Sequence, residues 1–178
     1  NGNGKSTLMK CVMGMVRPSQ GSIHLEIDGQ THDLTQLTTQ EIVNLGVAMV
    51  PEGRRLFPKL TVEENIMSVM ERSSWLWQGG RQAAEKRVNE ILDETQLTEK
   101  RAERAVDLAY AERKFLSLAR IMASEAKLWL LDEPASGLDP RSFDRFVALL
   151  RDYAKRGITI CIIEHNLYIV IKLSDRVA

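Results

Sequence analysis

Hydrophobic residues follow two periods along this chain, and the two periods alternate. Short, uninterrupted apolar runs at 47–50, 128–131 and 158–163 predict buried strands of a parallel sheet. Between the last two strands and before them, apolar positions recur three and four residues apart, as across 115–122, which predicts amphipathic helices. Strands that alternate with helices indicate an α/β core.

Turn and cap residues mark two further elements. Asp28-Gly29 follows an alternating segment at 22–27 and predicts a β-hairpin, the small antiparallel part of the fold. Asp139 before Pro140 predicts a helix N-cap with proline at the first helical position.

The strands lie in two separate parts of the sequence. Residues 1–59 and 123–178 carry them, whereas residues 60–122 show only helical patterns. We therefore expect a core built from both ends of the chain, with an inserted α-helical subdomain. Trp75 and Trp77 in this lobe fit either internal packing or a partner surface.

Composition narrows the functional classes. Lys+Arg and Asp+Glu are both 24, and this neutral balance gives no support to a nucleic-acid surface. The apolar runs are far shorter than the roughly 20 residues of a membrane-spanning helix, so a membrane role would need a partner. Cys11 and Cys161 match no metal or redox spacing, which predicts buried, reduced thiols of a cytosolic protein.

The first residues carry the end of a phosphate-binding motif. Gly4-Lys5-Ser6, with Gly2 before it, matches the last part of GxxxxGK[ST] and runs into a predicted helix. In that motif backbone N–H groups surround the phosphates, lysine contacts the β- and γ-phosphates, and the hydroxyl binds Mg²⁺. The motif's first glycine and its strand are expected upstream of Asn1, so the 178 residues alone should bind ATP poorly. We expect further strands after Val177.

Two acids follow the apolar strand at 128–131. Asp132 and Glu133 stand at its carboxyl end, the edge where open α/β sheets bind ligands. Asp132 is placed to hold Mg²⁺, directly or through water, and Glu133 to polarise a water for attack on a γ-phosphate. Such a pair alone is more often a solvated strand end, but together with Gly4-Lys5-Ser6 it predicts nucleotide hydrolysis.

The order of the remaining motifs resembles the ABC ATPase family. Segments 131–134, 136–139 and Glu164-His165 match its Walker B, D-loop and H-loop in order and spacing. Segments 46–52 and 108–112 stand where the family has its Q-loop and its signature motif. The resemblance covers essentially all 178 residues.

The resemblance implies a P-loop NTPase (RecA-like) core that pairs head to tail with a second ATPase subunit around two ATP molecules, as a homodimer or a heterodimer. By it, His165 holds Glu133 and the attacking water, and Asp139 crosses the interface. The implied nucleotide-binding residues are Asn1, Gly2, Asn3, Gly4, Lys5, Ser6, Thr7, Glu52, Ala109, Tyr110, Ala111, Glu112 and Asp139. The implied catalytic residues are Lys5, Glu133 and His165, and the implied Mg²⁺ ligands are Ser6, Glu52 and Asp132.

Two places depart from the family pattern. Glu52 stands where the Q-loop usually has glutamine, and an acid there can still bind a cation. Ala109-Tyr110-Ala111 stand where Ser-Gly-Gly is usual, so Ala109 lacks the hydroxyl. Ala111 adds a methyl group at a close phosphate approach, where a positive φ would disfavour a Cβ. We expect weaker closure of the ATP sandwich, with reduced but measurable hydrolysis.

Segments 51–58 and 61–65 resemble the ATPase subunits of branched-chain amino-acid and urea importers. This resemblance implies transmembrane permease subunits, docked on the helical lobe at the cytoplasmic face of the membrane, as partners. A periplasmic or extracellular solute-binding protein would act indirectly, and no nucleic acid is expected. Two alternatives stay open: a soluble ABC-type ATPase of DNA repair or translation, and a weakly hydrolysing, ATP-gated module.

Overall fold

The computed structural model describes residues 4–53, 56–70, 80–165, 170 and 174–176. Its core is a parallel sheet whose described strands lie in the order β3 (Val47–Val50), β4 (Leu128–Asp132), β5 (Thr159–Ile163). In the register, Leu128 of β4 pairs with Val47 on one side and with Thr159 on the other. The predicted strands therefore form one parallel sheet with β4 at its centre.

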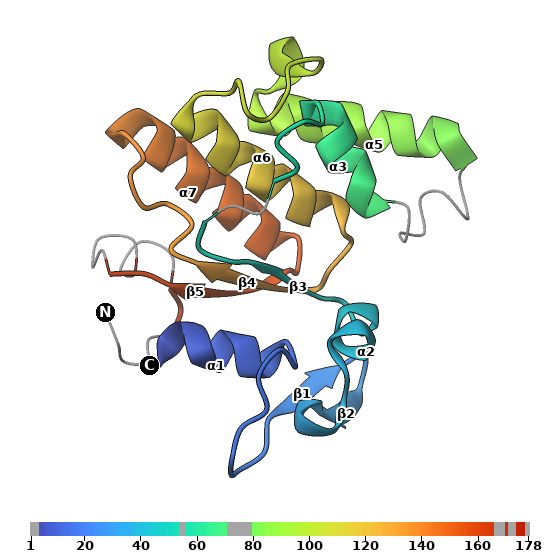
Figure 1. Cartoon of the computed structure of the whole chain (residues 1–178), viewed down its shortest axis with the longest axis vertical. Helices are drawn as coiled ribbons and strands as arrows, with labels where there is room; N and C mark the ends of the chain where they lie inside the picture. The colour runs from blue at the N-terminus through green and yellow to red at the C-terminus, as the bar shows by residue number, and fades with distance from the viewer. Residues whose placement is uncertain (1–3, 54–55, 71–79, 166–169, 171–173, 177–178) are drawn as a thin grey trace.

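Helices cover both faces of this sheet (Figure 1). The helices α6 (Tyr110–Ala123) and α7 (Pro140–Lys155) lie on one face, where Trp129 of β4 joins their buried cluster. The helix α1 (Lys5–Val12) lies on the other face and shares a second cluster with Leu130. Because successive strand residues point to opposite faces, a strand covered on both faces must be apolar throughout.

A hairpin follows α1 in the chain. The strands β1 (His24–Ile27) and β2 (Gln30–Asp33) pair antiparallel. Asp28 and Gly29 link them with φ of 51° and 74°, the left-handed pair of a two-residue hairpin turn. The short helices η1 (Leu34–Gln36) and α2 (Thr39–Asn44) then lead to β3.

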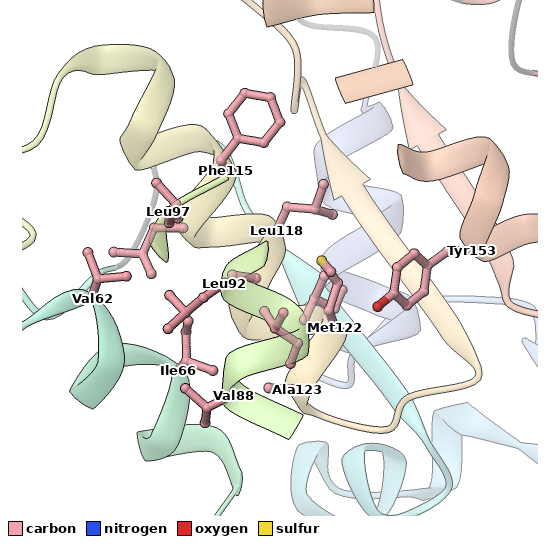
Figure 2. Packing of buried hydrophobic residues seen from close by; sticks show 14 of the residues in the cluster. Val62, Ile66, Val88, Leu92, Leu97, Phe115, Leu118, Met122, Ala123 and Tyr153 are labelled. Carbon is pink, nitrogen blue, oxygen red and sulfur yellow. The ribbon is translucent and has the colours of Figure 1, made fainter. Parts of the chain in front are cut away.

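The helices of the predicted lobe pack against each other and against the sheet. Figure 2 shows side chains of α3 (Val62–Met70), α5 (Gly80–Thr95) and α6 meeting in one cluster. The cluster continues into α7, where the ring of Phe115 lies edge-on at 5.6 Å from the ring of Phe146. The short helix η2 (Thr98–Lys100) leads from α5 towards α6. The helical lobe therefore shares its hydrophobic core with the sheet.

A polar network joins α5 to α7 beside this core. The Tyr153 hydroxyl donates to Glu94 at 2.7 Å and accepts from Arg87 at 2.8 Å. Burial, followed by the Glu94 hydrogen bond, raises the pKa of Tyr153 to about 12. The Tyr153 ring lies 4.9 Å from that of Trp129, which is 1% exposed and donates its indole N–H to the carbonyl of Ala126.

Burial at β5 and at the cysteines differs from the sequence prediction. Thr159 and Cys161 are exposed, because β5 is the outer strand of the described sheet. Cys11 is only partly buried, so the expectation of two buried thiols is wrong. Cys161 is not fully exposed, and the partial burial of its side chain raises the pKa of its thiol. Trp75 and Trp77 lie outside the described residues.

Within the described ranges, no helix combines the length and the apolar character that a membrane crossing requires.

Candidate nucleotide site

The first helix begins at the predicted phosphate-binding motif. Gly4 caps α1 with φ 72°, a left-handed conformation that glycine adopts without a Cβ clash. Lys5 is exposed and Ser6 half-buried at the first turn, whose unpaired N–H groups and helix dipole favour an anion. Figure 1 shows this end of α1 on the same side of the molecule as the carboxyl ends of β4 and β5. Thr7 follows, exposed, whereas residues 1–3 (Asn1, Gly2 and Asn3) lie outside the described residues.

Asp132 ends the central strand in a buried position. It is 4% exposed, and its Oδ1 has no hydrogen-bond partner among the described residues. A buried carboxylate oxygen without a partner is costly, and a cation would relieve that cost. No group of three or more acidic, histidine or cysteine side chains that could hold a metal occurs within the described ranges.

Glu133 follows in a left-handed backbone conformation, with φ 47°. Its N–H donates to the carbonyl of Ile163 at 2.9 Å, and its carbonyl accepts from Lys114 Nζ at 3.0 Å. Its side-chain Oε1 lies 2.9 Å from His165 Nε2. The ends of β4 and β5 therefore bring the predicted base and the predicted histidine together.

Glu164 approaches the same loop from β5. Its Oε1 accepts from the N–H of Ala135 at 3.1 Å. Burial raises the pKa of Glu164, more than the Ala135 hydrogen bond lowers it, and the nearby Glu133 charge adds to the increase. The sequence prediction used Glu164 only to locate the motif, and no periodicity signals this contact.

The start of α6 has one of the two hydrogen bonds of a capping box. Ala109 is its N-cap, and Glu112 Oε2 accepts from the Ala109 N–H at 2.7 Å. Alanine offers no side-chain oxygen in return, so the reciprocal bond of a capping box is absent. Ala111 lies in the first turn of α6 and is not among the residues with positive φ. The expected backbone strain at Ala111 is therefore wrong, because a helical residue accommodates a Cβ.

Tyr110 makes a contact that sequence reasoning missed. Its hydroxyl donates to the carbonyl of Ser136 at 2.9 Å, across 26 positions of sequence. Its ring lies beside Gly137, where an added Cβ would be 2.9 Å from the tyrosine oxygen. The signature and D-loop positions of one chain are thus in direct contact.

The two remaining predicted positions are Asp139 and Glu52, and both are exposed. Asp139 caps α7, accepting from the N–H groups of Arg141 at 3.1 Å and Ser142 at 3.0 Å. Hydrogen bonds from the side chain and backbone of Ser142 lower the pKa of Asp139. Glu52 is exposed in the turn after β3. Within the described structure, neither residue hydrogen-bonds to Asp132 or Glu133.

Known proteins share the sequence pattern and the fold of this chain. The family model described as ABC transporter matches residues 1–136. The chain belongs to the ABC transporter family. Within that family it is similar to ATP-binding proteins, and it spans about 60% of the length of the first of them.

Three relatives show the range of this ATP-binding family. A probable ABC transporter ATP-binding protein of Azorhizobium caulinodans is 34% identical over 99% of this chain and 60% of its own length. The high-affinity branched-chain amino acid transport ATP-binding protein BraG of Pseudomonas aeruginosa is 33% identical over 99% of this chain and 72% of its length. The lipopolysaccharide export system ATP-binding protein LptB of Haemophilus influenzae is 32% identical over 99% and 70%.

The fold is that of the ABC cassettes. A dimeric structure of a post-hydrolysis state of an ATP-binding cassette, bound to ADP and Pi, matches with a TM-score of 0.80. It shares 20% sequence identity over 95% of this chain and 73% of its own. This similarity confirms the predicted P-loop NTPase core with its parallel and small antiparallel sheets.

Proposed function

We propose that this chain is the ATP-binding and ATP-hydrolysing unit of an ABC transporter. One observation carries the proposal: Glu133 Oε1 lies 2.9 Å from His165 Nε2, directly after the buried Asp132. A carboxylate can accept a proton from a water that attacks the γ-phosphate, provided that a second group fixes its orientation. Glu133 accepts this proton, and His165 fixes the orientation of the Glu133 side chain.

The phosphates bind at the start of α1. Residues 1–7 carry the motif assigned to phosphate binding, and Lys5 adds its positive charge. Mg²⁺, when bound, neutralises charge on the phosphates and the leaving group. Ser6, Asp132 and Glu52 are the proposed ligands, and the unpartnered Asp132 Oδ1 supports this assignment.

The signature segment and Asp139 act on the nucleotide of a second ATPase subunit. The exposed start of α6 at Ala109 and Tyr110, with Ala111 and Glu112 behind it, supports this role. Asp139, exposed at the start of α7, faces solvent as an interface residue would. We divide the chain accordingly into core segments 1–59 and 123–178 and a helical subdomain at 60–122.

Hydrolysis of Mg²⁺-ATP by the full-length polypeptide, beside a Glu133→Gln variant, tests the proposal. We expect turnover in the parent protein and a loss of at least about 100-fold in the variant, since a general base typically contributes that factor or more. ATP affinity should change little. Equal turnover in both proteins would overturn the assignment of Glu133.

A second function, a weakly hydrolysing ATP-gated module, is favoured by Ala109, which supplies neither the hydroxyl nor the completed cap. In that case the parent protein and Glu133→Gln would both bind ATP and form ATP-dependent dimers, with equally low turnover. A soluble ABC-type ATPase would instead hydrolyse ATP without associating with any permease subunit in membranes.

For the transported solute, we propose import of branched-chain amino acids, urea or a similar small molecule. Segment 51–58 and the 33% identity to the branched-chain amino acid protein support import. The 32% identity to a lipopolysaccharide export protein supports the opposite direction of transport, export. The unit would bind permease subunits at the cytoplasmic face of the membrane and serve a solute-binding protein indirectly. Restored leucine uptake in cells that lack their own importer ATPase would support import, and restored lipopolysaccharide export would contradict it.

A further inference from the structure

The loop that carries Glu133 adopts a backbone conformation that needs outside support. A residue other than glycine with φ 47° is costly by itself and persists where neighbouring groups fix it. Both main-chain groups of Glu133 are fixed in this way. The N–H bonds to Ile163 of β5, and the carbonyl bonds to Lys114 of α6.

Lys114 is an unusual residue at its position. It is only 9% exposed, although lysine is rarely buried unless it is paired. Its ammonium group lies 3.0 Å from the Glu133 carbonyl, and its charge offsets part of the increase that burial causes in the pKa of Glu164. It also lines a small cavity beside Asp132. The buried charge of Lys114 therefore lies at the carboxyl ends of β4 and β5, although the residue itself stands on α6.

Tyr110 supports the same loop one turn earlier on the same face of α6. Residues four positions apart are neighbours on a helix, and Lys114 Nζ lies 5.9 Å from the centre of the Tyr110 ring, within cation–π range. The Tyr110 hydroxyl donates to Ser136 at 2.9 Å. The loop 133–137 is thus bonded to α6 at both of its ends.

We propose that Lys114 and Tyr110 are positioning residues that fix loop 133–137, and with it the orientation of Glu133, from the first turns of α6. We call the two side chains the α6 clamp. In the proposed dimer, the start of α6 contacts the nucleotide that the partner subunit binds. Binding of that nucleotide therefore affects the position of Glu133 through the hydrogen bonds of Tyr110 and Lys114. The inference rests on the proposed role of Glu133 in hydrolysis.

The test uses Lys114→Met, which keeps most of the length of the side chain but removes its charge and its donors. Lys114→Arg restores a donor, and Lys86→Met removes an equivalent group from an exposed position on α5 as a control. Tyr110→Phe removes only the hydroxyl at an exposed position, so it tests the clamp even where Lys114→Met folds poorly.

Two readouts separate the clamp from the proposed function. Amide hydrogen exchange over 133–139 should become roughly tenfold faster in Lys114→Met and faster in Tyr110→Phe, because a supporting hydrogen bond is lost. In the same variants kcat for ATP should fall about 10- to 100-fold, with KM changed less than about threefold, since a displaced base costs rate rather than binding. Lys114→Arg should recover most of both losses, and Lys86→Met should match the parent protein.

Each contrary outcome has one meaning. Unchanged exchange over 133–139 in both Lys114→Met and Tyr110→Phe overturns the clamp, whether or not the protein hydrolyses ATP. Faster exchange with unchanged kcat in an active enzyme overturns the positioning role. Faster exchange in a protein whose parent form is inactive leaves the structural clamp supported and refutes the proposed hydrolysis.

Discussion

Replacing Ala109 with serine should complete the cap of α6. The backbone at 109 already has N-cap geometry, with φ −62° and ψ 163°, and the Glu112 carboxylate already accepts from the N–H of residue 109. A serine oxygen could accept from the N–H of Glu112, and its hydroxyl would stay in solvent because the position is exposed. Serine in place of alanine at an N-cap stabilises by about 0.5–2 kcal/mol. For a domain of this size, about 1 kcal/mol raises Tm by about 2–4 °C.

Thermal and urea unfolding of the full-length polypeptide measure this gain. The urea midpoint should rise with an unchanged slope, since the cap alters stability rather than the surface exposed on unfolding. Ala109→Thr and Ala109→Val form an isosteric control pair that differs only in the hydroxyl, and only threonine should approach the serine result. Equal midpoints for serine and alanine, or for threonine and valine, would refute the reasoning.

Three further changes have defined outcomes. Ala111→Gly should raise the rates of ATP hydrolysis and ATP-driven dimerisation by removing the methyl group, and unchanged rates would exclude the methyl as the obstacle. Gly137→Ala should lower the free energy of unfolding by about 1–3 kcal/mol, because φ 75° disfavours a Cβ and the new atom would displace Tyr110 from its hydrogen bond. In a Tyr110→Ala background that loss should shrink; additive losses in a double-mutant cycle would disprove the contact. Glu164→Gln should raise Tm at pH 7. The pKa of Glu164 in the folded protein lies above the ordinary 4.5, so ionisation of this carboxyl lowers the stability as the pH rises from 4.5 through the folded-state pKa, and glutamine avoids that loss. The gain should vanish below pH 4.5, and a gain independent of pH would rule out the charge as its cause.

Local sequence signals predicted much of the fold. Asp28-Gly29 forms the turn of the hairpin, and Asp139 caps α7 before Pro140, because both effects depend on neighbouring residues alone. The apolar run at 158–163 predicted its strand but overstated the burial, since exposure of Cys161 depends on which strand lies beside it.

The site was predictable to the extent that its residues stand in motifs. Asp132, Glu133 and His165 follow apolar strands, and parallel strands bring their carboxyl ends to one edge of the sheet. The contacts of Tyr110 and Lys114 with the loop after β4 could not be read in the same way. They depend on how α6 packs against β4, and in the sequence Lys114 is one charged residue among several in an amphipathic helix.

The packing of Trp129 makes its fluorescence a measure of structural change in the core of this protein. The indole is buried three residues before Asp132, in contact with Tyr153, and it is the one tryptophan within the described ranges. Among the 178 residues, conversion of Trp75 and Trp77 to phenylalanine would leave Trp129 as the single source of tryptophan fluorescence, on the strand that carries Asp132. A spectral shift on addition of nucleotide would then report rearrangement at the centre of the sheet, in real time and without an attached dye.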